Sequence, residues 1–135
     1  MVPTTGASRR LTAAGAKLYL AKASQYLEAA QESLESGWSD AAVSLAVHAG
    51  INAADAISGA RQGIRSSGPD HSMAIKALGA SGREGAEAAR YLRKLLPLKT
   101  LAEYDAAPIS KQRAISALRS AEQIVAIAES VILSL

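Results

Sequence analysis

Apolar residues recur every three or four positions along most of the chain, which is the spacing of helices that bury one face. The first such stripe predicts a helix over residues 10–36, which Gly37 ends. A second stripe predicts a helix over residues 40–64, with Ser39 or Asp40 as the capping residue at its start. Residues 10–36 and residues 40–64 are therefore each predicted to form one long amphipathic helix.

The second half of the chain carries three more helical segments. A short helix over residues 71–78 follows a loop rich in glycine and serine. Ser81 and Glu84 match a capping box, which predicts the start of a fourth helix that Pro97 kinks. Ser110 caps the last helix, and no stretch shows the clear alternation of a strand.

These elements predict an all-α protein, an antiparallel up-and-down bundle of four to five helices with short connections. Residues 1–8 are expected to form a flexible N-terminal tail, and residues 9–135 a single domain. The apolar residues are mainly alanine and leucine, with no phenylalanine and one tryptophan, Trp38. Such a core is thin for a monomer, so we expect a homodimer. Trp38, at the first turn, is expected to plug one end of the bundle.

The amino-acid composition argues against several classes of protein. Cysteine is absent and histidine occurs twice, so we expect no disulfide framework, no metal site and no cofactor. No segment reads as a signal peptide or a membrane span, which makes a soluble cytoplasmic protein the expectation. The net charge is +3, but residues 61–99 are basic and residues 28–55 acidic. The basic part would attract a polyanion, or the two parts would neutralise each other.

The best pointer to chemistry is a polar group near the end of the fourth helix. Lys99, Glu103, Tyr104 and Asp105 lie within seven consecutive positions. A lysine can hold a phosphate, and a carboxylate or phenol can move a proton. The alternative is that Lys99 is a solvated helix residue and that Tyr104 packs between helices with its hydroxyl hydrogen-bonded.

Two further polar groups have both functional and structural interpretations. The basic residues of one turn of the fourth helix form either a phosphate-binding stripe or an ordinary solvated face: Arg90, Arg93 and Lys94. On the second helix, His48, Asn52 and Asp55 share one side at spacings of four and three. This spacing favours a hydrogen-bonded interior or dimer-interface cluster over a catalytic site.

Three segments occur in one order along residues 15–133: WSDAAVSLAVHAGINAADAI, a histidine that opens a short helix after a Gly/Pro loop, and L-x-x-A-E-Y-D. Together they resemble the HEPN domain family (higher eukaryotes and prokaryotes nucleotide-binding domain). The resemblance implies a helical bundle that pairs as a homodimer. Many such domains are metal-independent ribonucleases, others are toxins neutralised by a small nucleotidyltransferase, and some are non-catalytic binding modules.

The resemblance also implies where catalytic residues lie. Catalytic members carry an arginine, then four to six residues, then a histidine; the arginine holds the phosphate and the histidine moves a proton. The corresponding stretch here is Lys99 to Tyr104, with lysine for arginine and tyrosine for histidine. Lysine lacks the bidentate fork and tyrosine is a poor base at neutral pH. Glu103 or Asp105 is the alternative base.

A second pair with this spacing is Arg65 and His71, in a loop and the first turn of the next helix. Three functions follow as hypotheses. The first is an RNA-acting protein, the toxin-like component of a pair with a nucleotidyltransferase antitoxin, with a degenerate ribonuclease motif. The second is a non-catalytic module that binds a nucleotide, RNA or a partner. The third is a purely structural homodimeric bundle.

Overall fold

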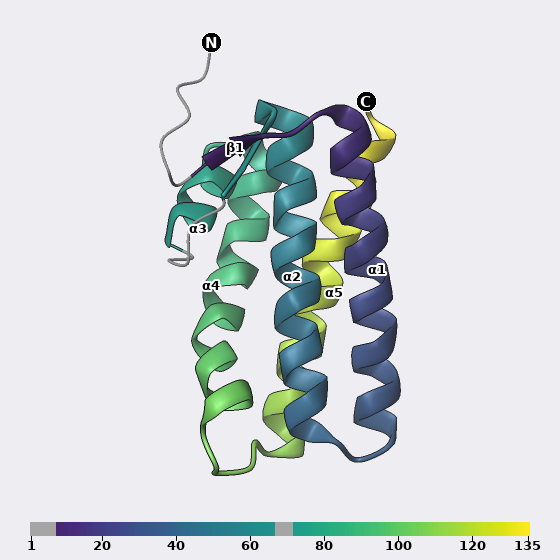
Figure 1. The fold of residues 1–135 in the computed structure, drawn as a ribbon, viewed down its shortest axis with the longest axis vertical. Coiled ribbons are helices and arrows are strands. Elements are labelled where there is room, and N and C mark those ends of the chain that lie inside the picture. Colours follow the sequence, from purple (N-terminus) through teal and green to yellow (C-terminus); the bar gives the residue numbers. More distant parts are fainter. Residues whose placement is uncertain (1–7, 67–71) are drawn as a thin grey trace.

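The computed structural model describes residues 8–66 and 72–135. Figure 1 shows four long helices side by side, running alternately down and up, with a short helix beside the upper end of the fourth. The predicted all-α antiparallel bundle is therefore confirmed. Within the described ranges the helices are α1 (Ala13–Glu35), α2 (Ser39–Gln62), α3 (Ser72–Gly79), α4 (Gly82–Tyr104) and α5 (Lys111–Leu133).

Helix α2 is the centre of the bundle. It contacts α1, α4 and α5, and no residue from Ala42 to Ala60 is fully exposed. Small residues let these helices approach closely: a Cβ atom at Gly50 would lie 2.6 Å from a methyl carbon of Leu95 on α4. The buried core consists almost entirely of alanine, valine, leucine and isoleucine side chains. Burial of this apolar surface is the main stabilising contribution.

The apolar character of α2 bears on the expectation that no segment is a membrane span. This helix of 24 residues contains an 18-residue window with a mean hydropathy of 1.2, so by length and composition alone it could cross a membrane. However, 67% of this apolar window is buried inside the protein. Because three other helices cover α2, its apolar residues are accounted for by its place in the core.

Two short strands, which the sequence pattern does not predict, lie at the upper end of the bundle (Figure 1). The strand β1 (Ser8–Arg10) pairs antiparallel with β2 (Ile64–Ser66). Beyond the ladder, the Leu11 amide donates to the Gly63 carbonyl at 2.7 Å. Ser8, expected in a flexible tail, thus belongs to a strand, and the rest of that predicted tail lies outside the described residues.

The helix ends confirm some of the boundaries that local sequence signals predict. Ser110 caps α5 as predicted, since its Oγ accepts from the Arg113 amide at 3.2 Å. The first helix begins later than expected because Thr12 caps it, accepting from the Gly15 amide at 3.0 Å. Gly63, at φ 69°, ends α2 before the expected residue, since glycine adopts this left-handed conformation without steric cost.

Two predicted capping hydrogen bonds are not made, because tertiary contacts use the same side chains. Asp40 does not cap α2; its Oδ1 accepts from the Ile109 amide at 2.8 Å and ties the α4–α5 loop to α2. Ser81 does not form a capping box with Glu84. Its hydroxyl donates to the Ala77 carbonyl at 2.8 Å and accepts from the side chain of Gln62 at 2.6 Å.

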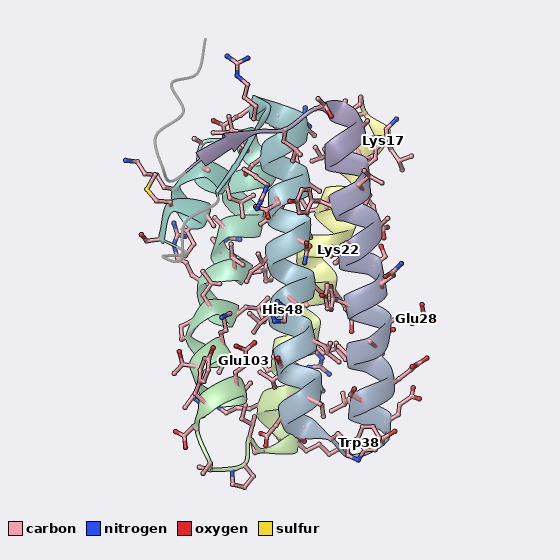
Figure 2. The ribbon with its side chains drawn as sticks, in the orientation of Figure 1. Lys17, Lys22, Glu28, Trp38, His48 and Glu103 are labelled. Atoms are coloured by element: carbon pink, nitrogen blue, oxygen red, sulfur yellow. The ribbon has the colours of Figure 1, made fainter. Side chains whose placement is uncertain are left out.

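Other expectations concern single residues. Trp38 is 65% exposed, so the prediction that it plugs the end of the bundle is wrong; Figure 2 shows it at the α1–α2 turn. Pro97 lies inside α4, which continues to Tyr104. The third helix begins at Ser72, and His71, its expected first residue, lies outside the described residues.

Candidate functional site

Lys99 and Glu103 lie one turn apart on α4. Lys99 Nζ is 3.3 Å from Glu103 Oε2, and the two side chains are 28% and 20% exposed. Residues four apart on a helix are neighbours, and this spacing brings the two side chains together. Lys99 is therefore a partly buried member of an ion pair rather than a freely solvated side chain.

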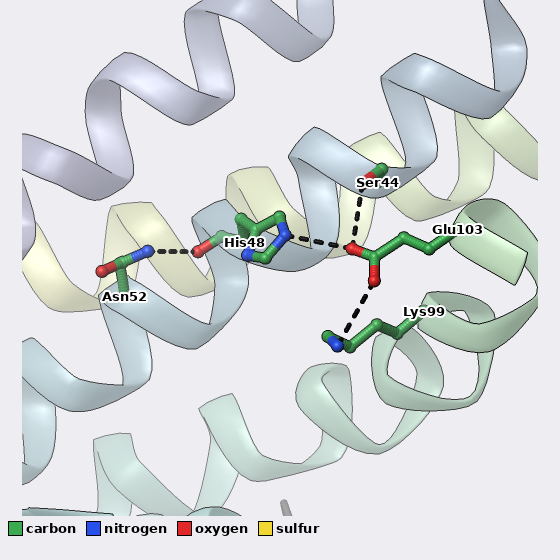
Figure 3. A network of polar contacts seen from close by, with 5 residues as sticks. All are labelled: Ser44, His48, Asn52, Lys99 and Glu103. Carbon is green, nitrogen blue, oxygen red and sulfur yellow. Dashed lines mark hydrogen bonds and ion pairs between the residues drawn. The ribbon is translucent and has the colours of Figure 1, made fainter. Parts of the chain in front are cut away.

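Two residues of α2 meet the same carboxylate (Figure 3). Ser44 Oγ donates to Glu103 Oε1 at 3.2 Å, and His48 Nε2 lies 3.1 Å from the same oxygen. Ser44 and His48 are also one turn apart and hence share one side of α2. We name the group Ser44, His48, Lys99 and Glu103 the α2–α4 cluster.

The electrostatics of the α2–α4 cluster keep Glu103 ionised. Desolvation by burial acts to raise the pKa of Glu103, but it is outweighed by the other contributions. Hydrogen bonds from Lys99, Ser44 and His48, together with the Lys99 charge, lower the pKa below the ordinary value of 4.5. Hydrogen bonds to a carboxylate favour its charged form. Glu103 is therefore a carboxylate at neutral pH.

The imidazole of His48 is held in place yet accessible. Its side chain is 38% exposed, and the ring of Tyr26 on α1 lies against it at 5.5 Å between centroids. The Asn52 side chain donates to the His48 backbone carbonyl at 2.7 Å. The contact of His48 with Glu103 joins residues 55 positions apart. Its sequence signal, a histidine on the polar strip of α2, favoured only an interior or interface role.

The other two residues of the predicted α4 group point elsewhere. Tyr104 is 76% exposed, so the alternative in which it packs between helices is wrong. Asp105 ends the helix, and its Oδ1 accepts from the Ala107 amide at 2.9 Å. Among the described residues, the side-chain contacts of His48 are with Glu103 and Tyr26, not with Tyr104 or Asp105. Their catalytic roles stay predictions.

The basic stripe on α4 is separate from the α2–α4 cluster. Arg90, Arg93 and Lys94 are exposed, whereas Leu92 and Leu95 of the same helix are fully buried. Lys94 Nζ lies 5.7 Å from the ring centroid of Tyr91. The three cations thus occupy the outward side of α4, as in a solvated face. Their role in binding nucleic acid stays a prediction.

Arg65 belongs to a second ionic group at the other end of α2. Its Nη1 lies 3.6 Å from Asp55 Oδ2, and its guanidinium lies 5.1 Å from the ring centroid of Tyr19 on α1. Burial raises the pKa of Asp55 to about 7, against the lowering effect of Arg65. We name Tyr19, Asp55 and Arg65 the Asp55–Arg65 cluster. His71, the proposed partner of Arg65, lies outside the described residues.

Comparison with known proteins gives one family. The sequence model described as the HEPN domain matches residues 16–131, a range that contains every member of the α2–α4 cluster. No curated protein matches the chain. In residues 8–66 and 72–135, no three His, Cys, Asp or Glu side chains are grouped so that they could hold a metal ion.

Proposed function

Because the chain belongs to the HEPN domain family, a family of nucleotide- or RNA-related helical modules, we propose that it acts on RNA as a metal-independent ribonuclease through the α2–α4 cluster. One observation carries the proposal: His48 of α2 meets Glu103 at 3.1 Å while Glu103 holds Lys99 at 3.3 Å. An imidazole, a carboxylate and an ammonium thus meet at one partly open place on the surface.

These three groups suit cleavage of RNA by its own ribose. The 2′-hydroxyl oxygen attacks the adjacent phosphorus, the bond from phosphorus to the 5′-oxygen breaks, and a 2′,3′-cyclic phosphate remains. His48 takes the proton of the 2′-hydroxyl, because a neutral imidazole has one ring nitrogen that can accept a proton. The 5′-oxygen leaves with a proton from solvent or from the imidazolium. DNA lacks the attacking hydroxyl and is not cut.

Lys99 supplies positive charge to the phosphate. An ammonium group has three N–H donors, so Lys99 can keep its contact with Glu103 and still donate to a phosphate oxygen. Preorganised positive charge stabilises the negative charge that develops in the transition state. Lysine replaces the arginine that the family resemblance implies, and it acts as a point charge rather than a bidentate fork.

Incubation of a mixed RNA pool with purified protein in EDTA tests the proposal. We expect cleavage by the wild type, a loss of about 100-fold or more in His48→Ala, and a clear loss in Lys99→Ala. Lys111→Ala, which removes an exposed lysine from α5, is the matched control and keeps full activity. Absence of cleavage by the wild type, or equal cleavage by His48→Ala, would contradict the proposal.

A second candidate function is a non-catalytic module that binds RNA, a nucleotide or a protein partner. It is favoured by the replacement of arginine and histidine at Lys99 and Tyr104 and by the existing ion pair of Lys99. It predicts RNA binding that Lys99→Ala weakens, without any product. Filter binding and gel analysis of the same samples separate the two functions.

The cellular role we propose is that of the toxin-like component of a bacterial toxin–antitoxin pair, acting in the cytoplasm as a homodimer. Its partner is a small nucleotidyltransferase antitoxin. The family membership supports this role. Induced expression is expected to arrest growth, and His48→Ala to relieve the arrest. Harmless expression of the wild-type protein at the same level would contradict it, and sedimentation of the purified protein tests the dimer.

A further inference from the structure

The contacts of His48 also indicate which of its two ring nitrogens exchanges a proton with the RNA. This inference rests on the proposed function. We infer that Glu103, oriented by Ser44, is a positioning residue that holds neutral His48 with its proton on Nε2, so that Nδ1 is the atom that exchanges a proton with the RNA. The inference concerns one ring atom, and it follows from the contacts of the α2–α4 cluster.

The first step concerns the oxygen that faces the ring. Glu103 Oε1 accepts from Ser44 Oγ at 3.2 Å and lies 3.1 Å from His48 Nε2. An ionised carboxylate accepts hydrogen bonds and cannot donate them. Lys99, at 3.3 Å from the other oxygen, helps to keep Glu103 ionised. His48 must therefore donate from Nε2.

The second step concerns the rest of the ring. A neutral imidazole carries a single N–H, and a donor at Nε2 leaves Nδ1 as the acceptor. Figure 3 shows the second ring nitrogen of His48 turned away from Glu103. Asn52 bonds the backbone carbonyl of His48 rather than its ring. Among the contacts of the described residues, none is made to Nδ1, and the side chain is 38% exposed.

The third step is the proton balance of the reaction. Nδ1 accepts the proton of the ribose 2′-hydroxyl as the oxygen attacks phosphorus, and His48 becomes an imidazolium. The Glu103 carboxylate beside Nε2–H stabilises that positive charge without taking the proton. Nδ1–H then gives a proton to the leaving 5′-oxygen, and the ring becomes neutral again with its proton on Nε2. Use of Nε2 would first require the contact with Glu103 to break.

The tautomer can be measured in the absence of RNA. We expect two-bond ¹H–¹⁵N spectra of the full chain at pH 8.5 to show protonated Nε2 and unprotonated Nδ1 for His48, assigned through its loss in His48→Ala. Glu103→Leu removes the acceptor and is expected to shift the His48 signals toward those of a free histidine peptide. A ring protonated on Nδ1, or signals unchanged in Glu103→Leu, would overturn the inference.

A second experiment identifies the reacting atom. Replacement of His48 by Nδ-methylhistidine blocks Nδ1 and leaves Nε2 as the only ring nitrogen that can take up a proton. We expect cleavage of RNA to fall at least 100-fold while the helical circular dichroism stays unchanged. Retained cleavage would overturn the inference but leave the ribonuclease proposal intact. If the wild type cleaves nothing, the ribonuclease proposal fails. Titration with the uncleaved RNA, which keeps its 2′-hydroxyl, then decides the inference, and a shift of the Nε2 signal of His48 rather than of its Nδ1 signal overturns it.

Discussion

Two carboxylate–cation pairs flank the central helix, and they have opposite electrostatic character. In the Asp55–Arg65 cluster the Asp55 side chain is 8% exposed, and burial raises its pKa to about 7. In the α2–α4 cluster three donors surround Glu103, and its pKa lies below the ordinary value. Hydrogen bonds to a carboxylate offset the cost of its burial, whereas a single cation at 3.6 Å does not.

The two clusters differ in role: the Asp55–Arg65 cluster links elements of the fold, and the α2–α4 cluster is the candidate catalytic site. The Asp55–Arg65 cluster joins α1, α2 and β2 through Tyr19 and Arg65. The α2–α4 cluster contains the additional proton-carrying group, His48, which is more exposed than either carboxylate. Perturbed ionisable groups occur in both functional and structural networks. The presence of a partly open proton carrier is what distinguishes the candidate site.

The largest expected difference is in the pH dependence of stability. The Asp55 carboxyl has a pKa of about 7 in the folded protein and an ordinary value of 3.8, so the folded state binds the extra proton between these values. Its contribution is fully present below pH 3.8 and is lost as pH rises through 7. We expect Asp55→Asn to remove a decline on the order of 4 kcal/mol in the free energy of unfolding. Urea titrations from pH 4 to 8 measure it, and an unchanged decline would contradict the account.

The next largest effect separates the two carboxylates by activity. Glu103→Gln is expected to lower RNA cleavage by about 10–100-fold, because the ring of His48 loses its charged partner. Asp55→Asn is the matched control, and we expect its rate to stay within about threefold of wild type because the substitution lies outside the proposed site. Initial rates on one RNA substrate measure both. Equal losses of cleavage rate in the two variants would mean that both act by destabilising the fold, and would contradict a specific role for Glu103.

A smaller effect tests the structural role of Arg65. Arg65→Ala leaves Asp55 buried without its cation, and at pH 8 we expect a loss of about 1–3 kcal/mol in the free energy of unfolding. Arg61→Ala removes an exposed pair with Glu84, which is 3.5 Å long, and is expected to cost less than about 0.5 kcal/mol. Denaturant unfolding of both proteins gives the comparison. Equal losses in the free energy of unfolding would contradict a structural role for Arg65 beside the buried Asp55.

The smallest expected effect concerns Ser44. Because its hydroxyl donates to Glu103 Oε1, Ser44→Ala is expected to raise the pKa of Glu103 and to cost less than about 1 kcal/mol of stability. Carboxyl ¹³C titration by NMR measures the pKa. Ser24→Ala is the control, since Ser24 bonds only the Leu20 carbonyl of its own helix. A pKa of Glu103 that is unchanged in Ser44→Ala would remove Ser44 from the site.

Most of the fold is predictable from the sequence because helical periodicity is a local signal. The stripes of α1, α2 and α5 and the cap at Ser110 need only neighbouring residues. The strands β1 and β2 are three residues each, too short for any alternation to show. The sequence predicts capping hydrogen bonds from Asp40 and Ser81, but their side chains bond groups far along the chain. Local patterns carry no information about such contacts.

The same limit applies to the candidate site. Lys99 and Glu103 lie four apart on one predicted helix, so the sequence groups them correctly near its end. The spacing predicts that His48 and Asn52 share one side of α2, but the contact of His48 with Glu103 depends on how α2 packs against α4. The strip also divides, since Asp55 bonds Arg65 instead. Periodicity predicts which residues share a side of a helix. Which residues of another helix they contact depends on how the helices pack.

Cleavage of a defined oligonucleotide tests the central claim most directly. A 5′-labelled DNA strand with a single ribonucleotide offers one 2′-hydroxyl, and the reaction is run in EDTA with wild type and His48→Ala. The account predicts one cut, directly after the ribonucleotide, with a 2′,3′-cyclic phosphate end, from the wild type only. Cutting elsewhere in the strand, cutting that requires a metal ion, or the same cut by His48→Ala would contradict it.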